Sequence, residues 1–355
     1  MHPFAINTRT IAPGRPAFII AEVGINHCGD RARAIEMCRV AQRCGADAVK
    51  FQTFVAEEFC GDPTQTFTYT SQGKSVTEPM LAMFRRHELS RADWLAIRAE
   101  CQDIGITFFS TPQNLSDLAL LQSIGVPLLK IGSDDFTNLP LIAAYAAQAL
   151  PLILSCGMSD LAEVHQALEA AGWFEGNQVA LLLCTSLYPT PPDSVHLSRL
   201  TTLRGAFPGL VVGFSDHTQG PLAAGLAVAL GACIFEKHFT LDHDLPGPDH
   251  WFSEDPAGLA AWISSIRNAE CVLGQPFVRP VPGEQDMRVL ARRSVVALRD
   301  IAPGERLDAD NIGSRRPGNG LPPARLAEIT GLRALRAIPA GSCLAYGDFG
   351  GDFGA

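Results

Sequence analysis

The sequence predicts an α/β protein in which a (β/α)8 barrel is followed by a small second domain. Apolar runs of strand length alternate with helical patterns eight times before residue 274. The runs are apolar throughout, which is typical of parallel strands covered by helices on both faces. Eight such units in about 260 residues match the barrel fold. A doubly wound open sheet is the structural alternative.

Each predicted strand is a short apolar run, and a stretch with helical spacing of its apolar residues follows it. We expect strands at 17–24, 47–54, 107–112, 128–135, 151–157, 179–186, 211–217 and 233–240. We expect helices at about 31–44, 91–104, 115–124, 139–149, 160–171, 195–206, 220–230 and 255–273. Residues 1–16 are expected to form a polar leader ahead of this repeat.

Two segments interrupt the regular alternation. Residues 55–90 are much longer than an ordinary connection and contain one short helical pattern, at 78–86, so we expect a lid or a substrate-binding excursion, with a decorative insertion as the alternative. The barrel is predicted to end at residue 274, where a proline-rich linker over 275–290 begins. Residues 291–355 contain a near repeat of strand, turn and strand, and are predicted to form a small domain that packs on its own barrel or on a partner subunit.

Composition excludes several kinds of protein. The formal net charge is −9 and the acidic residues are spread along the chain, which argues against nucleic acid as a partner. The 10 cysteines lack C-x-x-C spacing, so we expect small buried apolar residues in a reducing cytoplasm. No apolar run reaches about 18 residues, and the amino terminus lacks a secretory pattern, so we expect no membrane segment.

Two lysines lie inside apolar strands, at positions where a barrel places its working residues. Lys50 and Lys130 stand near the carboxyl ends of the second and fourth predicted strands. An unpaired buried charge costs several kcal/mol, so an anionic group should meet each lysine. Hydroxyl groups stand at neighbouring strand ends, on Thr111, Ser133 and Ser215. Lysines with hydroxyls suit a phosphorylated carboxylate. Structural ion pairs with Glu22 or Asp135 are the alternative.

The segment 211–240 is predicted to be a βαβ unit in which both strands end in histidine. Neighbouring parallel strands lie roughly 5 Å apart, so His217 and His238 can converge above the sheet. The pair alone is compatible with a metal site or with acid–base chemistry. With Glu22 at another strand end of the same barrel, a divalent metal is the favoured interpretation.

Nine short motifs, in order along the chain, resemble the sialic acid (N-acetylneuraminate) synthase family. They are Ile20-Ala-Glu-Val-Gly-Ile-Asn-His, Val49-Lys-Phe-Gln-Thr, Phe109-Ser-Thr-Pro, Lys130-Ile-Gly-Ser, Leu154-Ser-Cys-Gly-Met, Tyr188-Pro-Thr-Pro, Gly213-Phe-Ser-Asp-His-Thr, Glu236-Lys-His-Phe-Thr and Pro246-Gly-Pro-Asp. The last domain, with Arg315-Arg-Pro-Gly-Asn-Gly, resembles the antifreeze-like (SAF) domain that ends those enzymes.

The resemblance implies condensation of phosphoenolpyruvate with an N-acylated hexose, typically N-acetylmannosamine, to give a nine-carbon 2-keto acid and phosphate. It implies that phosphoenolpyruvate binds Lys50, Thr111, Lys130, Ser133 and Ser215, with Ser186 and Tyr188 beside them. It also implies that Glu22, Gln52, Asp135 and Asp249 face the sugar or the attacking water, with Glu22 as general base. His217 and His238 would hold Mn²⁺ or Mg²⁺. The family further implies a homodimer in which Arg316 of one subunit reaches the sugar in the other.

Three positions depart from the commoner family pattern. Asp135 stands where many members have glutamate, Ser186 where some have asparagine, and Cys28 in a loop that is usually more polar. The sugar could therefore be the 6-deoxy precursor of legionaminic or pseudaminic acid. Two alternatives of other classes are a Schiff-base aldolase using Lys50 or Lys130, and a non-catalytic barrel carrying a binding module.

Overall fold

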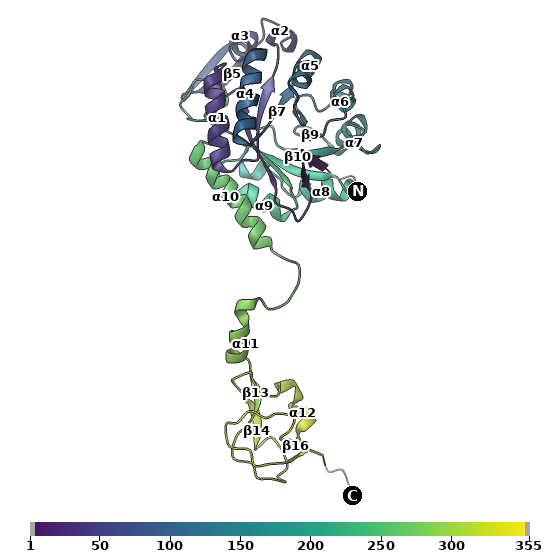
Figure 1. Ribbon diagram of the computed structural model, residues 1–355, viewed down its shortest axis with the longest axis vertical. Coiled ribbons are helices and arrows are strands. Elements are labelled where there is room, and N and C mark those ends of the chain that lie inside the picture. Colours follow the sequence, from purple (N-terminus) through teal and green to yellow (C-terminus); the bar gives the residue numbers. More distant parts are fainter. Residues whose placement is uncertain (1–3, 352–355) are drawn as a thin grey trace. The chain divides into compact units, whose positions relative to one another are not determined.

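The computed structural model describes residues 4–351, and its central element is a closed barrel of eight parallel strands surrounded by helices (Figure 1). The strands are β3 (Phe18–Gly24), β4 (Ala48–Thr53), β7 (Thr107–Pro112), β8 (Leu129–Ile131), β9 (Leu152–Ser155), β10 (Val179–Cys184), β11 (Val211–Asp216) and β12 (Ile234–His238). They follow one another in chain order, and β12 pairs with β3 to close the ring. The predicted (β/α)8 barrel is confirmed.

A helix follows every barrel strand and packs on its outer face. These helices are α1 (Arg31–Cys44), α4 (Arg91–Ile104), α5 (Leu115–Ile124), α6 (Leu139–Ala146), α7 (Leu161–Ala170), α8 (Arg199–Ala206), α9 (Leu222–Ala229) and α10 (Pro256–Leu273). Asp30, Ser90 and Asp160 cap the first turns of α1, α4 and α7 through their side-chain oxygens. Glycines in the left-handed conformation end α1, α4 and α5. These local signals explain why the helix boundaries were predictable.

The amino-terminal residues form a hairpin, so the expectation of a polar leader was wrong. Strands β1 (Phe4–Ile6) and β2 (Arg9–Ile11) pair in antiparallel fashion. Phe4, Ile6 and Ile11 are buried, and they pack with inward-facing residues of the barrel strands such as Phe18. The hairpin therefore covers the amino-terminal end of the barrel interior with apolar side chains.

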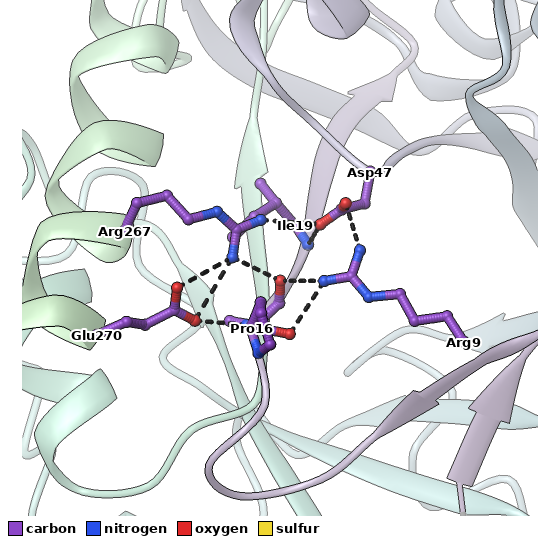
Figure 2. A network of polar contacts seen from close by, with 7 residues as sticks. Arg9, Pro16, Ile19, Asp47, Arg267 and Glu270 are labelled. Atoms are coloured by element: carbon purple, nitrogen blue, oxygen red, sulfur yellow. Dashed lines mark hydrogen bonds and ion pairs between the residues drawn. The ribbon is translucent and has the colours of Figure 1, made fainter. Parts of the chain in front are cut away.

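A network of ions and backbone groups ties this hairpin to the barrel (Figure 2). Asp47 forms ion pairs with Arg9 and, at 3.2 Å, with Arg267 of α10. The second carboxylate oxygen of Asp47 also accepts a hydrogen bond from the Ile19 amide at 2.8 Å. Arg267 contacts Glu270 as well, at 3.3 Å. The network lies at the amino-terminal ends of the strands. In (β/α)8 barrels this end contributes to stability, whereas the catalytic residues lie at the carboxyl ends.

The long connection after β4 contains a β-hairpin that the sequence reading did not predict. It comprises α2 (Ala56–Phe59), β5 (Thr66–Ser71), β6 (Lys74–Pro79) and α3 (Met80–Arg85), and α3 overlaps the helix expected at 78–86. The hairpin tip contacts the loop after β12, because Gln72 Nε2 donates to the Asp244 carbonyl at 2.8 Å and the Gly247 amide donates to Ser71 Oγ at 3.2 Å.

The chain divides into two compact units between Gly274 and Gln275. In the second unit, the segment expected to be a linker begins without regular structure, passes through a short 3₁₀ turn (η2, Pro282–Glu284) and ends in helix α11 (Gln285–Ala291). The remaining elements are β13 (Ser294–Ala297), β14 (Ile312–Arg315), α12 (Leu326–Ile329), β15 (Arg333–Ala334) and β16 (Phe349–Gly350), around their own apolar core. The two halves of the near repeat pair with each other at Ile301 and Ile338.

Across residues 4–351, no helix has the length and apolar character needed to cross a membrane.

Candidate active site

A cavity of about 690 Å³ opens at the carboxyl ends of the barrel strands. Every barrel strand contributes a side chain to its wall. In chain order these residues include Glu22, Lys50, Thr111, Lys130, Ser155, Cys184, Ser215 and Glu236. Side chains alternate in direction along a strand, so residues two positions apart, such as Lys50 and Gln52, both face the cavity.

Two lysines and two glutamates form a buried ion cluster in this cavity. Lys50 Nζ lies 2.9 Å from Glu22 Oε2 and 3.7 Å from Glu236 Oε2. Lys130 Nζ lies 3.8 Å from Glu236 Oε1. All four side chains are at most 6% exposed, so water does not screen these charges as it does at the surface. Both lysines thus meet carboxylates, and the partner of Lys130 is Glu236, whereas the sequence had suggested Glu22 or Asp135.

The four groups differ in how readily they exchange a proton. Burial raises the pKa of Glu22 to about 7, although the Lys50 charge opposes this effect. Burial would also raise the pKa of Glu236, but the charges of Lys130 and Lys50 outweigh it and lower that pKa. The pKa of Lys130 is lowered, chiefly by burial, whereas Glu22 and Glu236 outweigh burial at Lys50 and raise its pKa. Glu22 is therefore the member of the cluster that titrates near neutral pH.

Hydroxyl groups line the wall beside the lysines, and a neighbouring glycine lets two of them converge. Lys130 Nζ donates to Ser155 Oγ at 2.6 Å, and the Gly157 amide donates to Ser133 Oγ at 3.0 Å. A Cβ atom on Gly157 would lie 2.4 Å from Ser186 Oγ and 2.7 Å from Ser133 Oγ, so only glycine permits this convergence. Within the described part of the chain, Ser186 Oγ is buried without a hydrogen-bond partner. The wall therefore presents donors that a ligand oxygen can satisfy.

The two histidines predicted from the βαβ unit lie together. Their ring centroids are 5.4 Å apart, and the Tyr188 ring packs 4.2 Å from that of His217. His217 Nδ1 donates to the Thr185 carbonyl at 2.8 Å, which leaves the Nε2 lone pair for a ligand. Burial, followed by the nearby charge of His217, lowers the pKa of His238 well below its ordinary value, so its imidazole is neutral.

The histidine pair offers nitrogen ligands to a metal but does not form a closed site. His238 Nδ1 is buried and makes no hydrogen bond to any residue within 4–351. No third histidine, cysteine or carboxylate in that range completes a metal-binding group with the pair. A divalent cation would therefore need substrate or water oxygens for its other positions, as catalytic metal sites do. The two imidazoles fit such a group as nitrogen ligands.

All of the predicted site residues except Asp135 and Arg316 line the cavity. Asp134 lines it in place of Asp135, whose carboxylate accepts a hydrogen bond from Asn138 at 3.2 Å, at the start of α6. The chain turns after β8 ends at Ile131, so strand alternation no longer indicates which aspartate points inward. Arg316 is exposed in the second unit, directly after β14, and its role stays a prediction.

Several lining residues had not been assigned to the site from the sequence. Glu236 stands at a predicted strand end, two positions before His238 and hence on the same face, but no role had been given to it. Other side chains come from loops, from the hairpin and from the short helices beside it, where no periodic signal exists. They include Phe67, Tyr69, Gln113, Asp134, Trp251 and Phe252. Asp249, which was predicted, has its pKa raised to about 6 by burial.

The barrel, with its ion cluster at the carboxyl ends of the strands, defines a (β/α)8 enzyme with a site for a charged substrate. The chain belongs to the NeuB family, whose model matches residues 37–277, and a SAF domain matches residues 292–350. The family resemblance inferred from the sequence motifs is confirmed.

Several named relatives align with most of the chain. It is 40% identical over 333 residues to N,N'-diacetyllegionaminic acid synthase of Legionella pneumophila, and the aligned region covers 93% of each protein. It is 32% identical over 339 residues to the N-acetylneuraminate-9-phosphate synthase of Homo sapiens, covering 92% of this chain and 93% of the relative. The crystal structure of the Leptospira borgpetersenii N-acetylneuraminic acid synthetase superposes with a TM-score of 0.72 at 32% identity, over 80% of this chain and 94% of the other.

Proposed function

We propose that the protein is a sialic acid synthase-type transferase. It condenses phosphoenolpyruvate with an N-acylated hexose, N-acetylmannosamine or a close relative, to give a nine-carbon 2-keto sugar acid and phosphate. The observation that carries this proposal is the buried Lys50–Lys130 pair beside the hydroxyl-lined wall at Gly157. The relatives named as synthases of such sugar acids support it.

Phosphoenolpyruvate carries a carboxylate and a phosphate, and the cavity offers donors for both. Lys50 and Lys130 supply positive charge, while the hydroxyls of Ser133 and Ser186 supply hydrogen bonds at one point of the wall, where the Gly157 amide holds Ser133 Oγ in place. Hydroxyls of Thr111 and Ser215 complete the phosphoenolpyruvate site, with Tyr188 at its edge. The Glu236 carboxylate holds Lys130 and Ser215 in place, because it lies beside the ammonium and accepts a 2.9 Å hydrogen bond from Ser215 Oγ.

His217 and His238 would hold the divalent cation, Mn²⁺ or Mg²⁺, that this chemistry uses. When bound, it supplies Lewis-acid polarisation of the sugar aldehyde oxygen. The hydrogen bond from His217 Nδ1 to Thr185 fixes the tautomer and the ring orientation, as is usual for metal-binding histidines.

The remaining chemistry falls to the ion cluster. C3 of phosphoenolpyruvate attacks the aldehyde carbon, whose oxygen takes a proton and becomes a hydroxyl, and water adds at C2, where positive charge has developed. The C2–O bond to phosphate then breaks, which leaves the 2-keto group and releases phosphate. Glu22 takes the proton of this water, because its pKa of about 7 lets it exchange a proton at neutral pH. The lysines stabilise the carboxylate and the departing phosphate as ammonium groups. The raised pKa of Lys50 favours its ammonium form over a nucleophilic amine.

The lining residues favour a neutral sugar over a phosphorylated one. Among residues 4–351, Lys50 and Lys130 are the cavity's only lysine or arginine side chains, and both already lie beside carboxylates. Gln52, Asp134 and Asp249 can hydrogen-bond sugar hydroxyls. Several aromatic residues line the rest of the wall, including Phe67, Tyr69, Trp251 and Phe252. This apolar wall and the higher identity to the Legionella enzyme favour a 2,4-diacetamido-2,4,6-trideoxyhexose as the second candidate substrate, in a legionaminic or pseudaminic acid synthase.

Phosphate release tests this proposal. We expect it to require phosphoenolpyruvate and sugar together, to stop with EDTA and to return with Mn²⁺. N-acetylmannosamine and the diacetamido-trideoxyhexoses should react faster than N-acetylmannosamine 6-phosphate. Equal rates on all three would contradict the sugar-binding assignments, and activity in EDTA would contradict the metal. Covalent trapping of substrate by borohydride would instead support a Schiff-base aldolase.

We also propose that the active unit is a homodimer in which Arg316 reaches the partner's cavity and contacts the acyl group of the sugar. The proposal is supported by the match of residues 292–350 to the SAF domain and by the family resemblance of the motif Arg315-Arg-Pro-Gly-Asn-Gly. A light-scattering mass of one chain at assay concentrations would contradict the dimer.

A further inference from the structure

A buried ion pair lies between the strands that carry the two histidines. Asp216 of β11 and Lys237 of β12 face each other in register. His217 and His238 line the cavity, whereas Asp216 and Lys237 do not, because successive strand residues alternate in direction. The pair therefore lies behind the histidines, between the barrel and α10. Its side chains are 0% and 2% exposed.

The Lys237 ammonium touches the chain on both sides of His217. Nζ lies 3.5 Å from Asp216 Oδ2 and donates a hydrogen bond to the Thr218 carbonyl. Asp216 Oδ1 in turn accepts hydrogen bonds from the Thr218 amide at 2.8 Å and from Thr218 Oγ1 at 2.7 Å. The Trp262 indole of α10 donates to Asp216 Oδ2 at 2.8 Å. One side chain next to His238 thus holds the residue before and the residue after His217.

The same ammonium also contacts the segment that holds the His238 backbone. Lys237 Nζ lies 3.6 Å from Glu254 Oε1. The Glu254 amide donates to the His238 carbonyl at 2.8 Å, and the Thr240 amide donates to the Glu254 carbonyl at 2.9 Å. Lys237 therefore connects the backbone around both histidines at a single point.

The outer faces of these two strands are otherwise apolar. Val212, Phe214, Phe235 and Phe239 pack in the core between strands and helices. Replacing a buried ion pair with well-packed apolar residues is often neutral or stabilising, so stability alone does not account for charges at this one level. The two charged residues are next to the histidines in the chain. At this position along the strands, a small shift between β11 and β12 would change the separation of the imidazoles.

We propose that Lys237 and Asp216 are positioning residues: they set the spacing of the His217 and His238 imidazoles and thereby the affinity of the site for a divalent cation. The cation itself rests on the proposed function. Groups that orient metal ligands commonly change metal affinity by about 10- to 100-fold when they are removed.

The test is a titration of the full-length protein with Mn²⁺ alone, in which free Mn²⁺ is measured by electron paramagnetic resonance. Lys237→Met and Asp216→Asn should raise the Kd for Mn²⁺ by about 10- to 100-fold, and saturating Mn²⁺ should restore much of the lost kcat. Asp47→Asn is the matched control, because it makes the same change in the ion network at the opposite end of the barrel (Figure 2). Its Kd should equal that of the wild type.

The remaining outcomes separate this inference from the proposed function. A wild-type protein that does not bind Mn²⁺ would refute the metal site itself. If the wild type binds Mn²⁺ and the folded Lys237→Met variant binds it with the same Kd, the positioning role is refuted. If circular dichroism shows that both buried-pair variants are unfolded, Glu254→Gln decides, since this side chain is 16% exposed and its loss should be tolerated. We expect its Kd to rise about two- to fivefold, and an unchanged Kd would overturn the inference.

Discussion

Replacing Glu22 with glutamine should lower the activity strongly and, at alkaline pH, make the protein more stable. Burial raises the pKa of this carboxyl from 4.5 to about 7, so ionised Glu22 destabilises the folded state even with Lys50 beside it. A shift of this size corresponds to about 3 kcal/mol. Because the folded-state pKa is raised, the stability contribution of neutral Glu22 is fully present below pH 4.5 and is lost as the pH rises through about 7.

Glu22→Gln keeps the neutral form at every pH. Its free energy of unfolding should therefore match that of the wild type in acid and exceed it by up to about 3 kcal/mol above pH 8. Urea unfolding at pH 4 and pH 8.5 measures the difference. The kcat should fall by about 10²–10⁴-fold, the usual contribution of a general base. In the wild type, kcat/KM should rise with pH and level off above about pH 7.

Glu236→Gln is the matched control, because the lysines lower the pKa of Glu236. Its ionised form stabilises the fold above pH 4.5, so this substitution should destabilise the protein at neutral pH. A Glu22→Gln enzyme that retains more than a tenth of the wild-type kcat would refute the role of Glu22 as base. Equal effects of the two substitutions on stability would refute the pKa argument.

Four further substitutions test the assignments of site residues. Lys130→Met should lower kcat/KM for phosphoenolpyruvate by about 10²–10³-fold, as measured by steady-state phosphate release, because it removes a charge from the departing phosphate; a loss confined to the sugar KM would contradict this. Asp134→Asn should raise the sugar KM about tenfold, whereas Asp135→Asn should leave it unchanged, since only Asp134 lines the cavity; the reverse order would restore the assignment of Asp135. Arg316→Ala should raise the sugar KM without altering the circular dichroism spectrum, and an unchanged KM would show that the second domain does not complete the site.

Much of the barrel and its site could be predicted because both follow from short-range patterns. Apolar runs with intervening helical spacing identified all eight strands and helices. Once the strands were placed, their carboxyl ends and period-two alternation pointed to Lys50, Gln52, His217 and His238, all of which line the cavity. Helix ends were also predictable from local signals, as Ser90 and Gly105 at the two ends of α4 illustrate.

Features that depend on a turn or on a distant contact were not predictable in this way. The amino-terminal hairpin owes its burial to the barrel interior, which supplies the apolar partners of Phe4 and Ile6. Asp134 and Asp135 follow the end of β8, where the alternation has stopped. The hairpin at 66–79 has no apolar alternation of its own strong enough to distinguish it from a loop, because most of its side chains are exposed.

The sequence by itself determined the type of fold, the family and which strand ends carry charged or hydroxyl side chains, since these depend on neighbours a few residues apart. Only the tertiary structure decided which charges meet. Lys50 pairs with Glu22 and Glu236, Lys130 pairs with Glu236, and Lys237 bridges the two histidine strands. These distances arise when the barrel closes and brings residues far apart in the chain within a few ångströms, and no local pattern encodes that closure.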